Sequence, residues 1–292
     1  MADQDACPCC GERRAVHLFR VAGYDYVRCT SCDAARVDPL PPADPVELYD
    51  ESYFLGAAHG GYMDYDADAL LHRRNAAARL DRLVPWLPAR QPLHLVDVGC
   101  ASGYVLDEAV HRGWKARGVD ASPFARSRAT ARGHRVDATI SAAVDEGAAA
   151  GEQPDVVAFF QVLEHLFDAY DAIESAAGAL SSGGVLAIET WDRLSRVARA
   201  FGPRWQQANP PSVIHLFSRV GLTQMVERSG LRVVSMTSTS KLVSAGLIAG
   251  VAAHRYGALG RYAQRGAQAS RLTKVLIPYR LGDVVTLVAI KP

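Results

Sequence analysis

The feature that most constrains this chain is a glycine-bearing turn within residues 93–106, which read LHLVDVGCASGYVL. An alternating apolar run ends at Asp97, a loop bracketed by Gly99 and Gly103 follows, and a helical pattern begins at Tyr104. Glycine lets a ligand lie against bare backbone, and the first N–H groups of the following helix lack partners within it. We therefore expect a strand, a turn and a helix that bind a nucleotide at the carboxyl end of a parallel strand.

The spacing of the glycines argues against a dinucleotide. The fingerprint G-x-G-x-x-G needs glycine at three positions where this chain has Gly99, Ala101 and Tyr104, so the pyrophosphate would be poorly held. Residues 97–103, DVGCASG, instead resemble the first motif of class I S-adenosylmethionine-dependent methyltransferases, usually D-x-G-x-G-x-G. Ala101 replaces the middle glycine of that motif and slightly reduces the space for the methionine part of the cofactor.

A second predicted strand, residues 115–120, ends in an acid. Ser122 and Pro123 follow it as the N-cap and first residue of a helix. In the family that this region resembles, the acid corresponding to Asp120 binds both ribose hydroxyls, a use that suits a carboxylate. The alternative is that Asp120 is a solvated turn residue. Dehydrogenases place an acid at a similar position, so Asp120 supports the binding of a nucleoside but does not distinguish methyltransferases from dehydrogenases.

The N-terminal cysteines indicate a metal site. Five of the six cysteines lie in the first 32 residues, and four of these form two C-x-x-C pairs at the spacing that suits four thiolates around a tetrahedral zinc ion. A module of this size buries too little apolar surface to fold without the metal. Disulfides or free thiols are the alternatives, and Cys9 is a spare thiol that could replace Cys10. The expected ligands of this structural zinc are Cys7, Cys10, Cys29 and Cys32.

Composition and charge exclude several classes of partner. With 292 residues and 49% hydrophobic content, the chain can fold into one large domain and a small one. A net charge of +1 without a basic run gives no reason to expect a nucleic-acid partner. The N-terminus has no signal-peptide core, and the apolar run 242–253 is too short to span a bilayer. We expect a cytoplasmic protein with no membrane partner.

Alternating strands and helices continue along the chain and predict an α/β fold. Further strands are expected at residues 134–137, 154–160, 185–190, 231–237 and 283–290. The family pattern implies a Rossmann-like, seven-stranded, mostly parallel sheet with an antiparallel last strand. The expected organisation is a zinc-ribbon-like module at 1–42, a helical cover at 43–90 and a methyltransferase domain at 91–292.

A segment rich in alanine, glycine and arginine precedes the last strand, and we expect a helical insertion at 240–275. It could cover the active site, bind an acidic group of the substrate or form a homodimer contact. A membrane-surface role has less support, because aromatic anchors are few.

Two histidines are candidate catalytic bases. Residues 161–166 read QVLEHL, and many methyltransferases of the group carry L-E-H-L next to the methyl group. His165 could take a proton from a substrate hydroxyl, since its unperturbed pKa lies near working pH; alternatively, Glu164 and His165 brace the next helix. His215, on a loop before a predicted helix, is a second candidate with an equally plausible structural role. Trp191 and Asp192 would shape the substrate pocket.

The resemblance also implies the contacts of the cofactor, S-adenosylmethionine. An aromatic face near its sulfonium is favourable by roughly 0.5–2 kcal/mol, and Tyr62 and Tyr65 are candidates for it. Thr139 and Ile140 fall where the family packs the adenine ring. The expected cofactor-binding residues are Tyr62, Asp97, Gly99, Cys100, Ala101, Gly103, Asp120, Ala121, Thr139, Ile140, Phe160 and Gln161.

Together these motifs occur in the order typical of bacterial class I methyltransferases that modify small molecules. The resemblance implies methyl transfer to a small-molecule acceptor in a biosynthetic pathway, for a secondary metabolite or a sugar. O-methylation is favoured because two histidines offer bases, with N- or C-methylation as alternatives. A non-catalytic zinc-ribbon adaptor, a nicotinamide-dependent oxidoreductase and an RNA methyltransferase are the rival classes.

Overall fold

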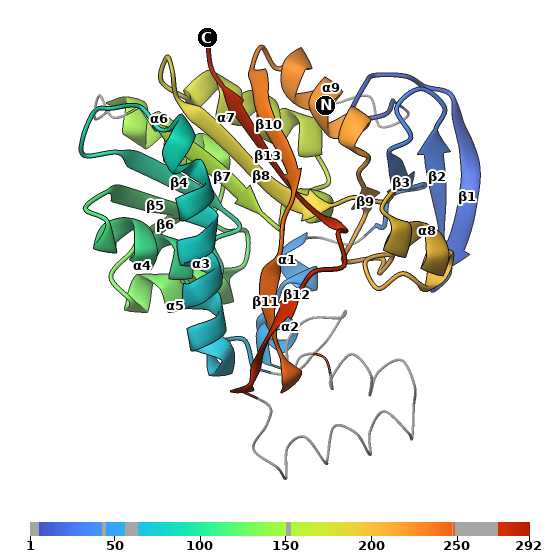
Figure 1. Cartoon of the computed structure of the whole chain (residues 1–292), viewed down its shortest axis with the longest axis horizontal. Coiled ribbons are helices and arrows are strands. Elements are labelled where there is room, and N and C mark those ends of the chain that lie inside the picture. The colour runs from blue at the N-terminus through green and yellow to red at the C-terminus, as the bar shows by residue number, and fades with distance from the viewer. Residues whose placement is uncertain (1–5, 43–44, 56–63, 150–152, 247, 249–273) are drawn as a thin grey trace.

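A seven-stranded sheet organises the computed structural model, which describes residues 6–42, 45–55, 64–149, 153–246, 248 and 274–292. Its strand order is β10-β13-β8-β7-β4-β5-β6, and only β13 runs antiparallel to its neighbours. The strands are β4 (His94–Val98), β5 (Lys115–Val119), β6 (Arg135–Asp137), β7 (Val156–Phe160), β8 (Val185–Trp191), β10 (Arg232–Ser238) and β13 (Val284–Ile290). This arrangement (Figure 1) confirms the expected Rossmann-like fold with a reversed last strand.

Helices cover both faces of the sheet. They are α3 (Ala69–Leu83), α4 (Tyr104–His111), α5 (Pro123–Ala131), α6 (Ile140–Ala149), α7 (Ala169–Ala179) and α9 (Arg219–Arg228). Side chains of α3 and α4 pack in one core cluster, and those of α6, α7 and α9 pack in another with the opposite face of the strands. The central strands β7 and β8 are buried along their whole length, which explains their continuous apolar sequence.

Short elements connect the sheet to its cover. They are α1 (Pro45–Leu48), α2 (Glu51–Leu55) and α8 (Arg196–Phe201), with the 3-10 turns η2 (Asp66–Asp68), η3 (Val84–Trp86), η4 (Leu163–His165) and η5 (Gly202–Arg204). The Phe54 ring of α2 lies 5.6 Å from the Phe124 ring of α5, centroid to centroid. The described part of the segment expected as a cover therefore packs against the helix that follows β5.

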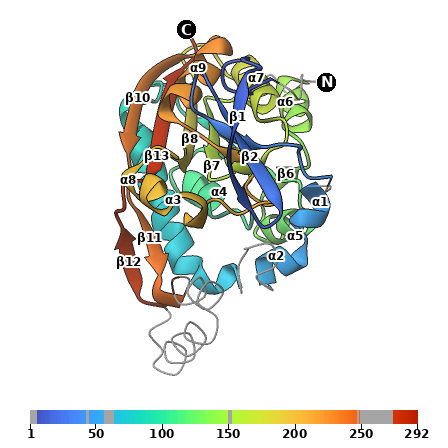
Figure 2. The same ribbon diagram turned by 90° about the vertical axis from the view of Figure 1, so that its right-hand side faces the viewer.

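The N-terminal module shares a sheet with the rest of the chain. Strands β1 (Ala15–Val21), β2 (Tyr24–Cys29) and β3 (Ala35–Val37) are antiparallel, and β9 (His215–Leu216) pairs with β3 as the fourth strand. The buried Tyr26 hydroxyl donates a hydrogen bond of 2.5 Å to the Val213 carbonyl. Figures 1 and 2 show the module on the side of the molecule away from β6. The expected boundary at residue 42 therefore does not separate the module from the rest of the chain, because β9 belongs to the module's sheet.

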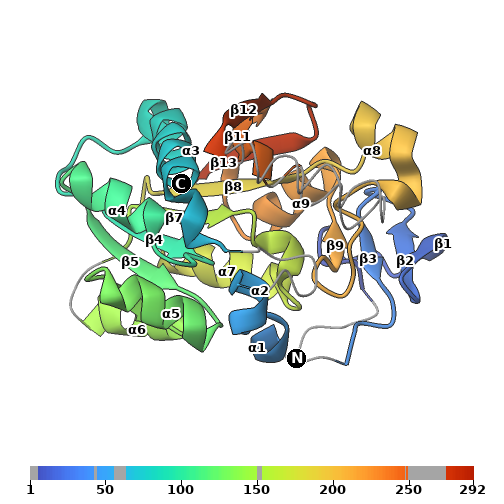
Figure 3. The same cartoon turned by 90° about the horizontal axis from the view of Figure 1, so that it is seen from below.

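The segment before the last strand differs from the helical insertion that we expected at 240–275. Residues Lys241–Ser244 form strand β11, which pairs antiparallel with β12 (Leu276–Tyr279), next to α3 (Figure 3). Asn75 of α3 makes this possible, because its amide donates to the Leu242 carbonyl at 3.0 Å and accepts from the Leu242 N–H at 2.8 Å. The expectation was wrong at β11, whose backbone groups gain partners in the extended form.

The central residues of that insertion, 249–273, lie outside the described residues, and with them its four arginines and any contact to a second chain. Among the helices that the structure describes, none combines the length and apolar content needed to cross a membrane.

Replacing Asn75 with alanine removes both hydrogen bonds to β11. We expect the free energy of unfolding, measured in urea, to fall by about 1–3 kcal/mol, because two backbone groups lose their partner. Alanine at the exposed neighbour Arg74 is the control and should change stability much less. Equal stability of the two variants would contradict the role of Asn75.

Candidate active site

The backbone of the turn after β4 allows other atoms to approach it closely. Gly99 and Gly103 have φ of +73° and +83°, a region that residues with side chains rarely adopt. A Cβ at Gly99 would lie 2.5 Å from Val162 Cγ2, so the segment after β7 packs directly on this backbone. Ala101, which replaces the family's middle glycine, also has a positive φ of +47°, at a cost of about 1–2 kcal/mol. The turn therefore keeps the glycine-like conformation in spite of its methyl group.

Asp120 links this turn to the end of β5. Its two carboxylate oxygens accept hydrogen bonds of 2.9 Å from the N–H groups of Ala101 and Ser122. The Ser122 hydroxyl in turn accepts from Ala125 N–H at 3.3 Å, which confirms the predicted N-cap. Burial raises the pKa of Asp120 above its usual value, opposed by the two backbone hydrogen bonds. Each oxygen keeps a further lone pair for a ligand.

A second carboxylate lies at the end of β4. Asp97 is 2% exposed, and burial raises its pKa to about 7, against the opposing charge of Arg79. Asp120 repels it, because the two negative charges are close enough to interact. Two neighbouring buried carboxylates favour a ligand that carries positive charge.

The remaining expected cofactor contacts lie around the ends of β5, β6 and β7. The Thr139 hydroxyl accepts from Ala142 N–H at 3.2 Å, at the start of α6, and Ile140 packs against the core. Arg126 donates to the carbonyls of Asp120 and Ala121 at 2.9 and 2.8 Å. Cys100 is buried against β5, where a Cβ at Gly118 would lie 2.6 Å from its sulfur.

Aromatic rings gather between α3 and the start of α4. Tyr65 stacks on His72 at 4.0 Å between ring centroids, and His72 lies 5.1 Å from the Tyr104 ring. Burial lowers the pKa of His72 to about 4, so this imidazole is neutral at pH 7. Tyr65 is thus held within a stack, while Tyr62, the other candidate for the sulfonium, lies outside the described residues.

His165 is held in one orientation by a backbone carbonyl. Its Nδ1 lies 2.6 Å from the Ser212 oxygen, which also accepts from the Tyr49 hydroxyl at 2.9 Å. The Tyr49 ring packs edge-on against the imidazole at 5.7 Å between centroids. Because a carbonyl only accepts, Nδ1 carries the proton in the neutral ring and Nε2 is the nitrogen that can take one up.

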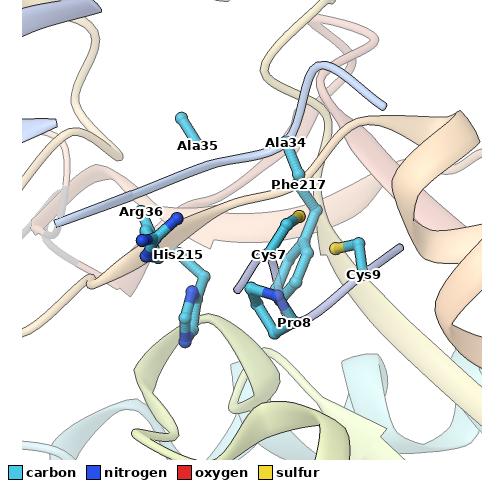
Figure 4. Close-up of a pocket in the computed structure, with 8 residues that line it drawn as sticks. All are labelled: Cys7, Pro8, Cys9, Ala34, Ala35, Arg36, His215 and Phe217. Atoms are coloured by element: carbon cyan, nitrogen blue, oxygen red, sulfur yellow. The ribbon is translucent and has the colours of Figure 1, made fainter. Parts of the chain in front are cut away.

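His215 lies in a different environment from His165. It belongs to β9, and its ring faces a cavity beside the module with Cys7, Arg36 and Phe217 (Figure 4). The side chain is buried, and burial lowers its pKa to about 4. We expected His215 on a loop, either as a second candidate base or in a structural role. The structure puts it in a strand instead, because pairing of His215 with Arg36 joins this segment to β3.

The four expected ligand cysteines come together. The sulfurs of Cys7, Cys10, Cys29 and Cys32 all lie within 4.8 Å of one another. Positive φ values at Gly11 and Asp33 let each C-x-x-C pair turn back on itself. Cys9 is fully buried, and a Cβ at Gly221 of α9 would lie 3.2 Å from its sulfur. Its thiol interacts with those of Cys7 and Cys32, but Cys9 is not one of the four cysteines whose sulfurs all lie within 4.8 Å of one another.

Three side chains at the ends of β7 and β8 form a group that we call the Lys241 cluster: Gln161, Trp191 and Lys241. The Lys241 ammonium donates to the Gln161 amide oxygen at 2.7 Å and lies 4.4 Å from the centre of the Trp191 ring. Phe160 precedes this group, with the Arg79 guanidinium 5.0 Å from its ring centre. Sequence reasoning missed Lys241, because a single lysine in a segment expected to be helical carries no signal.

Tyr49 and Ser212 were also missed, although they hold His165. They stand 163 residues apart, and only the fold brings both to the imidazole. The only sequence feature that could have indicated Tyr49 is the tyrosine-rich stretch before α3. Such a stretch is as typical of a hydrophobic core as of a functional site.

The profile of a family described as methyltransferase domain matches residues 69–236 of this chain. Over 160 residues the chain is 29% identical to a ubiquinone biosynthesis O-methyltransferase of Methylobacterium nodulans, covering 50% of this chain and 63% of that protein. Over 165 residues it is 30% identical to a protein of the same name from Cereibacter sphaeroides, covering 53% and 66% respectively. The chain thus spans less than two thirds of the length of these relatives.

A solved structure shows a similar fold. It is a chain of the Haloferax volcanii complex between the Trm112 methyltransferase activator and a methyltransferase. The two chains share 17% identity with a TM-score of 0.51, over 77% of this chain and 94% of that chain. At this identity the likeness is one of fold alone.

Proposed function

The chain belongs to the methyltransferase domain family, of the class I S-adenosylmethionine-dependent type, and on that premise we propose that it methylates a hydroxyl oxygen of a small molecule. The observation that carries the proposal is the joining of the glycine turn to Asp120 through the Ala101 N–H. This contact places a carboxylate beside the backbone of the glycine turn, which suits a nucleoside with a charged amino-acid tail. The printed names of the aligned relatives, O-methyltransferases, support oxygen as the methylated atom.

The residues at the turn fit S-adenosylmethionine. We propose that Asp120 accepts from the ribose hydroxyls, that the backbone of Gly99, Ala101 and Gly103 contacts the amino-acid tail, and that Asp97 offsets its positive charge. We assign Ala121, Thr139 and Ile140 to the adenine side and Phe160 to the methionine side. The cofactor supplies an electrophilic methyl group. The chain itself contributes orientation and a site with little water, which is where most of the rate gain of such a reaction arises.

His165 is the proposed general base. Donation of its Nδ1 proton to the Ser212 carbonyl leaves Nε2 to receive the proton of the acceptor hydroxyl. Tyr49 shares the same carbonyl and packs on the ring, so it is a positioning residue for the imidazole. N- or C-methylation is the second candidate, and it would not need this base.

The four thiolates are the donor set that zinc prefers in a closed structural site, and we propose that they hold one zinc ion. The metal would fix β3, and β9 pairs with β3 only a few residues after Ser212. The module would therefore help to hold the carbonyl that orients His165. The finer expectation, a secondary-metabolite or sugar pathway, stays a prediction.

Substitution of Asp120 tests the cofactor site. By calorimetry, Asp120→Asn should weaken S-adenosylmethionine binding by about 100-fold, the loss expected for two charge-assisted hydrogen bonds of about 1.5 kcal/mol each. Asparagine keeps the shape of the side chain, and Asp81→Asn at an exposed carboxylate of α3 is the control. An affinity unchanged in Asp120→Asn would show that the ribose binds elsewhere.

Substitution of His165 tests the base. With an acceptor that the wild-type chain methylates, His165→Ala should lower kcat by roughly 10²–10⁴, the usual contribution of such a base. Tyr49→Phe removes only the second donor to Ser212 and should have a smaller effect. His17→Ala, at an exposed histidine of the module, is the control. If His165→Ala kept the wild-type kcat, His165 would have only a structural role.

The metal is tested by elemental analysis. Purified wild-type protein should contain about one zinc per chain, and Cys29→Ser should lose it because a structural site needs all four ligands. Cys9→Ser is the matched control, since Cys9 is a buried cysteine of the same module outside the four-sulfur group. Metal-free wild-type protein, or zinc retained in Cys29→Ser and lost in Cys9→Ser, would refute this ligand set.

A further inference from the structure

The Lys241 cluster lies where a methyl acceptor would approach. Gln161 directly follows β7, and Trp191 is the last residue of β8, so both stand at the carboxyl ends of parallel strands. Ligands of such sheets bind outside these ends. Lys241, the first residue of β11, reaches across to both side chains, and β11 in turn is held by Asn75 of α3.

The Lys241 ammonium has a neutral partner in place of an anion. Within the part of the chain that the structure describes, its hydrogen bond goes to the Gln161 amide and its other contact is the Trp191 ring. Burial lowers the pKa of Lys241 to about 8, with the charge of Glu189 acting in the opposite sense. A desolvated ammonium is costly unless an anion faces it, so this arrangement favours a negatively charged ligand.

The acids around the cluster already have donors of their own. Glu189 accepts from Arg79 at 2.7 and 2.9 Å, and Arg82 lies 3.4 Å from its other oxygen. Two further acids accept from neutral donors through one oxygen each: Glu164 from Thr190 at 2.8 Å, and Asp283 from Tyr279 at 2.9 Å. Their other oxygens, Glu164 Oε1 and Asp283 Oδ1, are buried without a hydrogen-bond partner among the described residues. Lys241 is thus the cation of this region whose hydrogen bond goes to an uncharged acceptor, whereas Arg79 and Arg82 both contact Glu189.

Gln161 supplies an unused donor next to the ammonium. Its Nε2 is buried and has no hydrogen-bond partner in the described structure. The ammonium can only donate, so the amide must turn its oxygen toward Lys241 and its NH₂ group away. The backbone is held in this position by a positive φ of +59° and by donation of the Gln161 N–H to the Glu189 carbonyl at 2.7 Å. Strain of this kind is concentrated at functional sites.

We propose that Lys241 and the Gln161 amide bind a carboxylate of the methyl acceptor, a group that itself takes no part in the reaction. This inference rests on the proposed function, and it gives the acceptor a chemical class: a small hydroxy acid. It also moves the side chain of Gln161 from the cofactor, where we expected it, to the acceptor.

The charge balance of methyl transfer explains why the bound anion is not the attacking oxygen. As the new O–CH₃ bond forms, the CH₃–S bond breaks and its electron pair returns to sulfur, while the hydroxyl proton goes to Nε2 of His165. Once the proton has left, the negative charge on the attacking oxygen is consumed as the O–CH₃ bond forms, so an ammonium there would stabilise the deprotonated acceptor more than the transition state. A carboxylate that does not react keeps its charge throughout, so Lys241 can bind it equally well in the ground state and in the transition state.

The test is a binding experiment on the full chain with saturating S-adenosylhomocysteine. Benzoate and benzamide, which have nearly the same shape but differ in charge, are titrated by calorimetry and by tryptophan fluorescence. We expect wild-type protein to bind benzoate at least tenfold more tightly than benzamide. Lys241→Met should remove this preference, and Lys241→Arg should keep it. Lys115→Met, at an exposed lysine of β5, is the matched control and should behave as the wild type.

Gln161→Leu is a second variant, which tests the proposal if Lys241→Met does not fold. It should weaken the binding of benzoate several-fold and leave the binding of benzamide unchanged. Equal or undetectable binding of the two probes to wild-type protein would overturn the proposal, as would a preference that survives in Lys241→Met. A preference for 4-nitrophenolate over benzoate that depends on Lys241 would also overturn it, because the cation would then face the attacking oxygen.

Affinity for S-adenosylhomocysteine, measured separately in each variant, distinguishes the two proposals. Wild-type protein that binds S-adenosylhomocysteine but shows no preference for benzoate refutes the carboxylate site alone. Wild-type protein that binds no S-adenosylhomocysteine refutes the proposed function.

Discussion

The hydrogen bond from the Ala101 N–H to the Asp120 carboxylate is the contact on which the rest of the site depends. It ties the turn after β4 to the end of β5, and the second Asp120 oxygen ties the start of α5 to the same point through Ser122. The turn can follow this path because Gly99 leaves room for Val162, so the segment after β7 packs on it as well. One carboxylate thus links the ends of two strands to the start of α5.

The N-terminal module is structurally coupled to this site. Its sheet is completed by β9, and the segment just before β9 supplies the Ser212 carbonyl that orients His165. The Tyr26 hydroxyl adds a buried hydrogen bond to Val213 in the same segment. In the proposed enzyme, a metal held by the four cysteines would therefore contribute to catalysis through the position of one carbonyl, without contact to the reacting atoms.

Charge is distributed unevenly between the two sides of the strand ends. The buried carboxyl groups of Asp97 and Asp120 lie at the turn, where burial raises the pKa of both and a cationic cofactor would favour their ionised form. Around β7 and β8, Arg79 and Arg82 share the single carboxylate of Glu189, and Lys241 faces only an amide and an indole ring. The proposed cationic donor and anionic acceptor would therefore bind on different sides, the donor beside Asp97 and Asp120 and the acceptor beside Lys241.

The sequence by itself determined the sheet, the glycine turn, the cap at Ser122 and the four-cysteine group. These features depend on local patterns: apolar periodicity, glycine where φ is positive, and fixed spacing between thiols. Tertiary structure alone decided that Lys241–Ser244 is a strand, because its partner Asn75 stands far away in the chain. It likewise placed His215 in the module sheet by pairing it with Arg36, and it joined Lys241 to Gln161 across 80 residues. Contacts of this kind leave no periodic trace in a single sequence, because each depends on one residue meeting another that only the folded chain brings near.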